Sequence, residues 1–116
     1  MDFKLLVALV EHDKTTKVLK GARQAGATGA TVIHQARGEG LKEARSFLGL
    51  ALESPRDVLL FVVATHLSRT ILEKIAELGE FDIQQGAGIA IQLNVEDAVG
   101  VTQQVRLLGD SLGDAP

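Results

Sequence analysis

The chain contains the same order of predicted elements twice, about fifty residues apart, and this repetition limits the folds it can adopt. In the first half, the nearly uninterrupted apolar run from Phe3 to Val10 has the length and composition of a strand buried on both faces. A helix is predicted next, with Asp13 as its N-cap and Gly26 as its end. Its apolar positions are Val18, Leu19, Ala22 and Ala25. A second strand is predicted over Ala30 to Ala36.

The second half repeats this order. Val58 to Ala64 is again an apolar run of strand length, and Thr65 or Ser68 is the expected cap of the helix that follows. The apolar stripe of this helix is Leu67, Ile71, Leu72, Ile75 and Leu78. Gly79 is its expected end, and Ile89 to Val95 is the fourth predicted strand.

The order βαββαβ predicts an α+β ferredoxin-like sandwich, in which a four-stranded antiparallel sheet has both helices on one face. The second sheet face then needs a cover, and the short polar tail, residues 102–116, does not supply one. We therefore predict an oligomer. A long connection, Arg37 to Asp57, joins the second and third strands and exceeds an ordinary hairpin loop. The expected organisation is one domain over residues 1–101, which includes the 37–57 connection, followed by the tail.

Composition excludes several classes of function. A length of 116 residues suits one hydrophobic core. The formal charge of −3 and the absence of Trp and Tyr argue against nucleic acid as a partner. With no cysteine, the chain has no disulfide or thiol nucleophile. No apolar run is long enough for a signal-peptide core or a bilayer span, so we expect a cytoplasmic protein without direct membrane insertion.

A Gly-x-Gly motif, Gly86 to Gly88, lies directly before the fourth predicted strand. Glycine permits close approach of backbone amides to an anion, as in phosphate-binding loops. However, no Lys or Arg occurs between Lys74 and Arg106. Short glycine motifs are weak signals, and from the motif alone a tight turn that binds nothing is the favoured interpretation.

The βαββαβ order, the segment GATGATVIHQARGEG before a long connection, and Gly-x-Gly followed by VEDAV resemble the PII signal-transduction proteins, and most closely their divergent PII-like branch. The resemblance covers about residues 2–101. It implies a homotrimer that binds adenine nucleotides as small-molecule effectors in clefts between subunits, without enzymatic activity or a catalytic residue. It further implies a T-loop, here residues 37–57, that engages a membrane transporter or an enzyme.

The resemblance also assigns site residues, as an expectation. Those expected to contact the effector are Gly29, Ala30, Thr31, Gly38, Glu39, Gly40, Val63, Ala64, Gln85, Gly86, Ala87, Gly88 and Ile89. Nitrogen-sensing PII proteins have cations where this chain has Ile89, Gly100 and Thr102. Because charge-assisted bonds to phosphate are strong, we expect an AMP-like or ADP-like ligand, or a cyclic or adenylyl-type nucleotide, in preference to ATP. No other cofactor is expected.

The long connection is unusually apolar near its middle. Arg45, Phe47, Leu48 and Leu50 form the expected partner-binding tip, although local packing of the same segment is an alternative. Arg37, Arg45 and Arg56 either replace the missing cations or are ordinary solvated charges, and the second interpretation is favoured. The connection has no Tyr for uridylylation and no matching Gln and Lys for 2-oxoglutarate, so nitrogen sensing in the standard manner is not expected.

Three histidines raise the question of a metal site. His12 and His66 each follow a predicted strand, and His34 lies within the second strand. No pair has helical spacing and no Cys or carboxylate cluster accompanies them, so no metal site is expected. The alternatives left open are a CutA-like structural or metal-associated trimer without a nucleotide site, and an ACT-like dimer that binds an amino acid.

Overall fold

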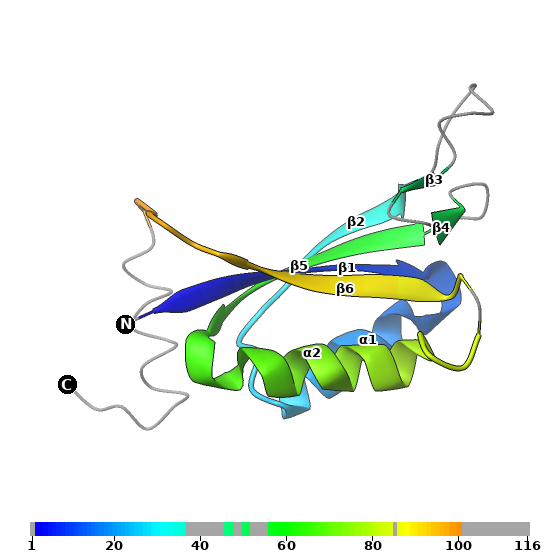
Figure 1. The fold of residues 1–116 in the computed structure, drawn as a ribbon, viewed down its shortest axis with the longest axis horizontal. Helices are drawn as coiled ribbons and strands as arrows, with labels where there is room; N and C mark the ends of the chain where they lie inside the picture. Colours follow the sequence, from blue (N-terminus) through cyan, green and yellow to red (C-terminus); the bar gives the residue numbers. More distant parts are fainter. Residues whose placement is uncertain (1, 37–45, 48–49, 52–55, 85, 101–116) are drawn as a thin grey trace.

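The computed structural model describes residues 2–36, 46–47, 50–51, 56–84 and 86–100. The first half consists of β1 (Phe3–Glu11), the short 3-10 helix η1 (His12–Lys14), α1 (Thr15–Gln24) and β2 (Thr31–Ala36). The second half consists of β5 (Arg56–Ala64), α2 (Thr65–Gly79) and β6 (Gly88–Asn94). The four long strands form one antiparallel sheet in the order β2-β5-β1-β6, with both helices on one face (Figure 1). The predicted βαββαβ sandwich is confirmed.

Two short strands lie within the predicted long connection. β3 (Ser46–Phe47) and β4 (Leu50–Ala51) pair with each other and form a separate two-stranded sheet. Arg56 and Asp57, assigned from sequence to the connection, are the first two residues of β5. Of the predicted partner-binding residues, Phe47 and Leu50 are partners in the small ladder, whereas Arg45 and Leu48 lie outside the described residues.

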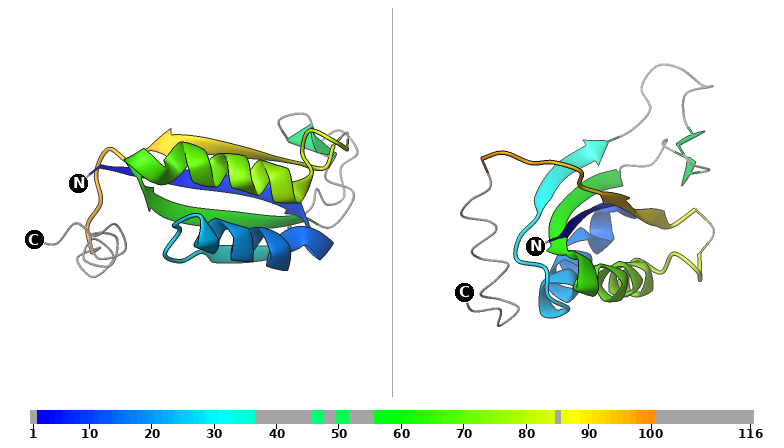
Figure 2. Two further views of the ribbon diagram at one scale, coloured as in Figure 1. Left: turned by 90° about the horizontal axis from the view of Figure 1, so that it is seen from below. Right: turned by 60° about the vertical axis from the view of Figure 1, so that its left-hand side comes forward.

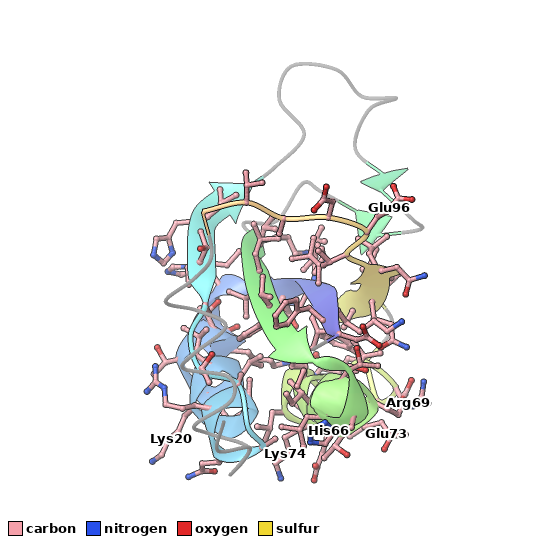
Figure 3. All side chains as sticks on the ribbon, turned by 90° about the vertical axis from the view of Figure 1, so that its left-hand side faces the viewer. Lys20, His66, Arg69, Glu73, Lys74 and Glu96 are labelled. Atoms are coloured by element: carbon pink, nitrogen blue, oxygen red, sulfur yellow. The ribbon has the colours of Figure 1, made fainter. Side chains whose placement is uncertain are left out.

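The core lies between the sheet and the helices. Alternate residues of the central strands point toward the helices, as the period of two in a strand requires. The buried side chains of β1 and β5 are Leu6, Ala8, Val10, Leu59, Phe61 and Val63. They pack against Val18, Ala22, Ile71 and Ile75 of the two helices, which lie side by side beneath the sheet (Figure 2). The labelled charged side chains Lys20, Arg69, Glu73 and Lys74 lie around the outer side of the helices (Figure 3).

The opposite face of the sheet is also apolar. Leu5 lies between Val62 and Leu93, and adjacent rows contain Leu60 with Val7 and Ile91, and Val58 with Leu9 and Ile89. Val62 is 44% exposed and Leu93 is 45% exposed. In the part of the chain that the structure describes, no helix lies on this face (Figures 1 and 2). We call it the open face. None of the described helices is long and apolar enough to cross a membrane.

Three of the helix ends differ in detail from the sequence predictions. Asp13 does not cap α1, because it lies within η1 and the N-cap position is Lys14, without a side-chain cap. Thr65 and Ser68 are both inside α2, whose N-cap is Ala64. Gly79 is the last helical residue, and the left-handed conformation falls on Glu80 at φ 59°. Packing explains why residue 79 is nevertheless a glycine, since a Cβ there would lie 2.4 Å from Cε1 of Phe81.

Lys14 joins the end of β1 to the end of α2. Its Nζ lies 3.1 Å from carboxylate oxygens of both Glu11 and Glu80. Burial lowers the pKa of Lys14, but the hydrogen bonds and charges of the two glutamates outweigh it, so that the pKa lies above its ordinary value of 10.5. Because the folded state raises this pKa, the stabilisation is fully present below pH 10.5 and is lost as the pH rises through the folded pKa.

We expect Lys14→Met to lower the free energy of unfolding by about 0.5–1 kcal/mol at neutral pH, because two part-exposed ion pairs are lost. The check is thermal melting of both proteins at pH 7 and above pH 11. The difference between them should vanish at the higher pH. A difference that persists there would show that packing of the lysine stem, and not its charge, is responsible.

Candidate effector site

The glycine loop, here residues 84–88, connects the turn after α2 to β6. Gly86 has a φ of +74°, a conformation that glycine adopts without strain, and a Cβ there would meet nothing within 4 Å. The amide of Ala87 donates to the carbonyl of Gln84 at 3.1 Å, and Ala87 is buried. Gln85 lies outside the described residues.

Gly88 is glycine for a different reason. A Cβ on it would lie 2.2 Å from Cε1 of Phe81 and 2.5 Å from the carbonyl oxygen of Leu9. The second of these contacts is with backbone, which cannot move away cheaply. Packing alone therefore explains Gly88, whereas the backbone conformation explains Gly86.

Arg56, the first residue of β5, binds the glycine loop across the end of β1. Its Nη1 donates to the carbonyl of Ala87 at 2.7 Å, and its Nη2 donates to the carbonyl of Gly86 at 2.5 Å. The residue is only 5% exposed, and its buried Nε has no hydrogen-bond partner among the described residues. The interpretation of Arg56 as an ordinary solvated charge was therefore wrong. Its guanidinium places a positive charge at the loop that sequence alone left without one.

The other expected effector residues lie elsewhere. Gly29 and Ala30 precede β2, and Thr31 begins it, opposite Leu60. All three are exposed. Gly38, Glu39 and Gly40 lie outside the described residues.

Two more expected residues, Val63 and Ala64, are buried at the end of β5. Val63 pairs with Lys4, whereas Gly88 pairs with Val10. Lys4 and Val10 are six residues apart on β1, so at about 3.3 Å per residue Val63 and Gly88 lie about 20 Å apart along the sheet. The expected set does not form one site within a single chain.

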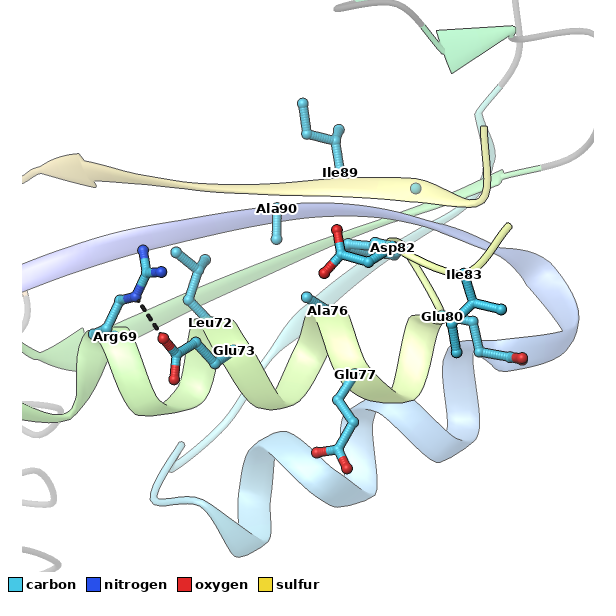
Figure 4. A pocket seen from close by; sticks show the side chains of 12 residues that line it. Arg69, Leu72, Glu73, Ala76, Glu77, Glu80, Asp82, Ile83, Ile89 and Ala90 are labelled. Carbon is cyan, nitrogen blue, oxygen red and sulfur yellow. Dashed lines mark hydrogen bonds and ion pairs between the residues drawn. The ribbon is translucent and has the colours of Figure 1, made fainter. Parts of the chain in front are cut away.

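A pocket of about 740 Å³ lies between α2 and β6. It is lined by Gly88, by Ile89 and by several acidic residues (Figure 4). The acidic residues are Glu73, Glu77, Glu80 and Asp82. Among the described residues that line it, Arg69 is the one cation, and it is paired with Glu73 at 2.8 Å. Repulsion by these carboxylates makes the pocket a poor phosphate site. Ile89 lies on the side of β6 away from α2, whereas Ala90 faces the helix (Figure 4).

A second cluster of polar side chains lies near the start of β5. Nδ1 of His12 is 3.0 Å from Oδ2 of the buried Asp57, and Nδ1 of His34 is 3.4 Å from the same oxygen. The hydroxyl of Thr15 donates to this carboxylate at 2.5 Å. His66 is exposed and lies beyond the opposite end of β5, which finishes at Ala64.

Sequence reasoning missed this cluster because it looked for helical spacing. A topological signal was available. In the predicted antiparallel sheet, the end of β1, the end of β2 and the start of β5 meet at one edge, and the three residues lie at these strand ends.

The sheet order and the two helices on one face place the chain in the class of ferredoxin-like sandwiches, built from two strand-helix-strand halves. The model of the nitrogen regulatory protein P-II family matches residues 3–104, and the chain belongs to this family. Members of the family are signalling regulators rather than enzymes.

Solved structures agree with this assignment. A protein of Thermus thermophilus described as PII-like is 26% identical, with a TM-score of 0.57 over 82% of this chain and 90% of its own. The apo form of CPII from Thiomonas intermedia, a nitrogen regulatory PII-like protein, is 16% identical in sequence. Its TM-score is 0.62, and the match covers 82% of this chain and 90% of CPII. The structure of CPII bound to ADP, AMP and acetate is 18% identical in sequence. Its TM-score is 0.59, and the match covers 83% of this chain and 90% of CPII. A comparison with curated protein sequences gave no significant match.

Proposed function

We propose that this protein is a cytoplasmic, trimeric PII-like regulator that binds an adenine nucleotide, AMP or ADP in preference to ATP, between its subunits. The observation that supports this most directly is the buried guanidinium of Arg56 at the glycine loop. One cation with a glycine-rich backbone suits a ligand with few phosphate charges better than a triphosphate. The structurally similar CPII has been observed with ADP and AMP.

An intersubunit site would also account for the separation of the expected residues. Gly29 to Thr31 and Val63 to Ala64 are far from the glycine loop in one chain. In an oligomer that buries the open face, these residues of one subunit can approach the glycine loop of the next. The effector would then be bound only in the assembled protein.

The regulatory output in this proposal is the connection over residues 37–57. An effector that binds two states of this connection with different affinity would change how strongly it holds a partner, such as a membrane transporter or an enzyme. Phe47 and Leu50, which pair in the small hairpin, belong to this surface together with Arg45 and Leu48.

The ligand preference can be tested by adding the missing charge. We expect the wild-type protein to bind AMP and ADP more tightly than ATP in calorimetric titrations. Ile89→Lys places a cation directly after the glycine loop, at the end of the open face of β6. Because a charge on this face can also weaken the assembly, sedimentation must first show that the variant keeps the mass of the wild-type protein. The variant should raise the affinity for ATP by about tenfold or more, because a bond to a charged group contributes about 1.5–3 kcal/mol.

Gln92→Lys is the matched control, because it adds the same charge to β6 on the opposite face of the strand. It should leave the ATP affinity unchanged. Thermal melting establishes that both variants remain folded. The absence of binding heat for AMP, ADP and ATP with the wild-type protein would contradict the proposed function.

A further inference from the structure

We propose that His12, His34 and Asp57 form a binding site for a first-row divalent cation of the Zn²⁺ or Ni²⁺ type. The ligand atoms of the three side chains all lie within 4.8 Å of one another. This site is separate from the glycine loop and does not depend on the nucleotide proposal.

The distances suit a small ion with nitrogen and oxygen ligands. Tetrahedral Zn²⁺ at about 2.0–2.2 Å from each ligand separates the ligand atoms by about 3.3–3.6 Å. The two histidine Nδ1 atoms lie 3.0 Å and 3.4 Å from Oδ2 of Asp57. Small rotations of the exposed imidazoles, which are 50% and 65% exposed, are sufficient to admit the ion. Water can complete the coordination from the exposed side.

The choice of ligands excludes the common hard cations. Mg²⁺ and Ca²⁺ are held almost entirely by oxygen, whereas imidazole favours Zn²⁺, Ni²⁺ and Cu²⁺. Two imidazoles with one carboxylate leave open positions for water or another ligand.

The backbone of β2 presents His34 to this site. Ile33 pairs with Val58 and Ala36 pairs with Arg56, so two residues of β2 oppose the single residue Asp57. Such a bulge turns a side chain out of its regular direction, and bulges are common beside functional sites. Without the extra residue, His34 would occupy an ordinary position in the ladder.

Asp57 is positioned by a second interaction. It is fully buried at the start of β5, and the hydroxyl of Thr15 donates to its Oδ2 at 2.5 Å. Hydrogen bonds of this kind to a ligating carboxylate fix its orientation and strengthen metal binding. Thr15 is therefore a positioning residue in this proposal.

A cation here would have a consequence for regulation. His34 is near the end of β2 and Asp57 is the second residue of β5, the two strands that flank residues 37–55. The ladder already pairs Ala36 with Arg56 at this end of the sheet, so a metal that binds both strands would add a second link between the start and the end of this connection.

The test is a titration of the full-length protein with Zn²⁺ and with Ni²⁺, followed by calorimetry and by thermal melting. We expect one ion per chain, and a rise in melting temperature with ion concentration. His12→Ala and His34→Ala should each lower the Zn²⁺ affinity by about tenfold or more. Thr15→Val should also weaken binding, and Thr15→Ser should restore it. Mg²⁺ should not compete.

His66→Ala is the matched control, since it removes the third histidine of the chain, at the opposite end of the sheet. It should leave both affinity and melting response unchanged. The visible absorption of bound Co²⁺ gives a separate readout, which His34→Ala should abolish while the protein remains folded. The proposal is overturned if Zn²⁺ does not bind, or if binding survives the double replacement of His12 and His34. In that case the imidazoles contact Asp57 directly and no metal is bound.

Discussion

Replacing Arg56 with methionine is expected to lower the free energy of unfolding by about 2–4 kcal/mol. The guanidinium donates to the carbonyls of Gly86 and Ala87, and bonds to a charged group contribute about 1.5–3 kcal/mol each. Methionine fills much of the same volume but leaves the buried carbonyl of Ala87 and the part-buried carbonyl of Gly86 without this donor. Urea denaturation of the two proteins measures the difference. If the nucleotide proposal holds, affinity for AMP and ADP should fall as well.

Two further variants separate the geometry of Arg56 from its charge. Arg56→Lys keeps the charge but loses the planar pair of donors, so it should recover only part of the stability. Arg69→Met is the control, because Arg69 is an exposed cation paired with Glu73 on α2. Its loss should cost no more than about 0.5 kcal/mol. If Arg56→Met costs no more than Arg69→Met, the guanidinium does not hold the glycine loop.

The elements of the fold could be predicted from the sequence because each has a strong local pattern. Phe3 to Val10 and Val58 to Ala64 are apolar runs of strand length, and the two helices have clear apolar stripes. The order of these elements then limits the topology to a small number of choices. The structure confirms the four strands, each within two residues of its predicted bounds, and the two helices, whose N-caps differ from those predicted.

The site was harder to predict, because it depends on contacts between distant residues. Arg56 and Asp57 follow a proline and end a polar segment, so their composition indicates a loop. Only the register of β5 against β1 buries both of them, one beside the glycine loop and the other beside His12. The bulge that presents His34 has no local sequence signal. Likewise, Gly88 was assigned to ligand contact, although packing against Phe81 and Leu9 already requires a glycine there.

The open face leads to a second prediction, that Val62→Glu separates the proposed oligomer into single chains of 12.3 kDa. Val62 lies in a row with Leu5 and Leu93 and is 44% exposed in the isolated chain. Exposed apolar rows of this kind mark surfaces that are buried on association. A carboxylate in such an interface would lose its water without gaining a partner, which is strongly unfavourable. Sedimentation equilibrium over a range of concentrations measures the mass.

The same measurement on Gln92→Glu tests whether the position of the charge matters. Gln92 pairs with Leu6, so it lies on the helix side of β6, at the edge of the sheet. This control should keep the mass of the wild-type protein, whereas Leu93→Glu, on the open face of the same strand, should behave like Val62→Glu. A wild-type protein that sediments as a single chain would contradict the proposed assembly. In that case the expected effector residues, about 20 Å apart along the sheet, would have no way to contact one ligand.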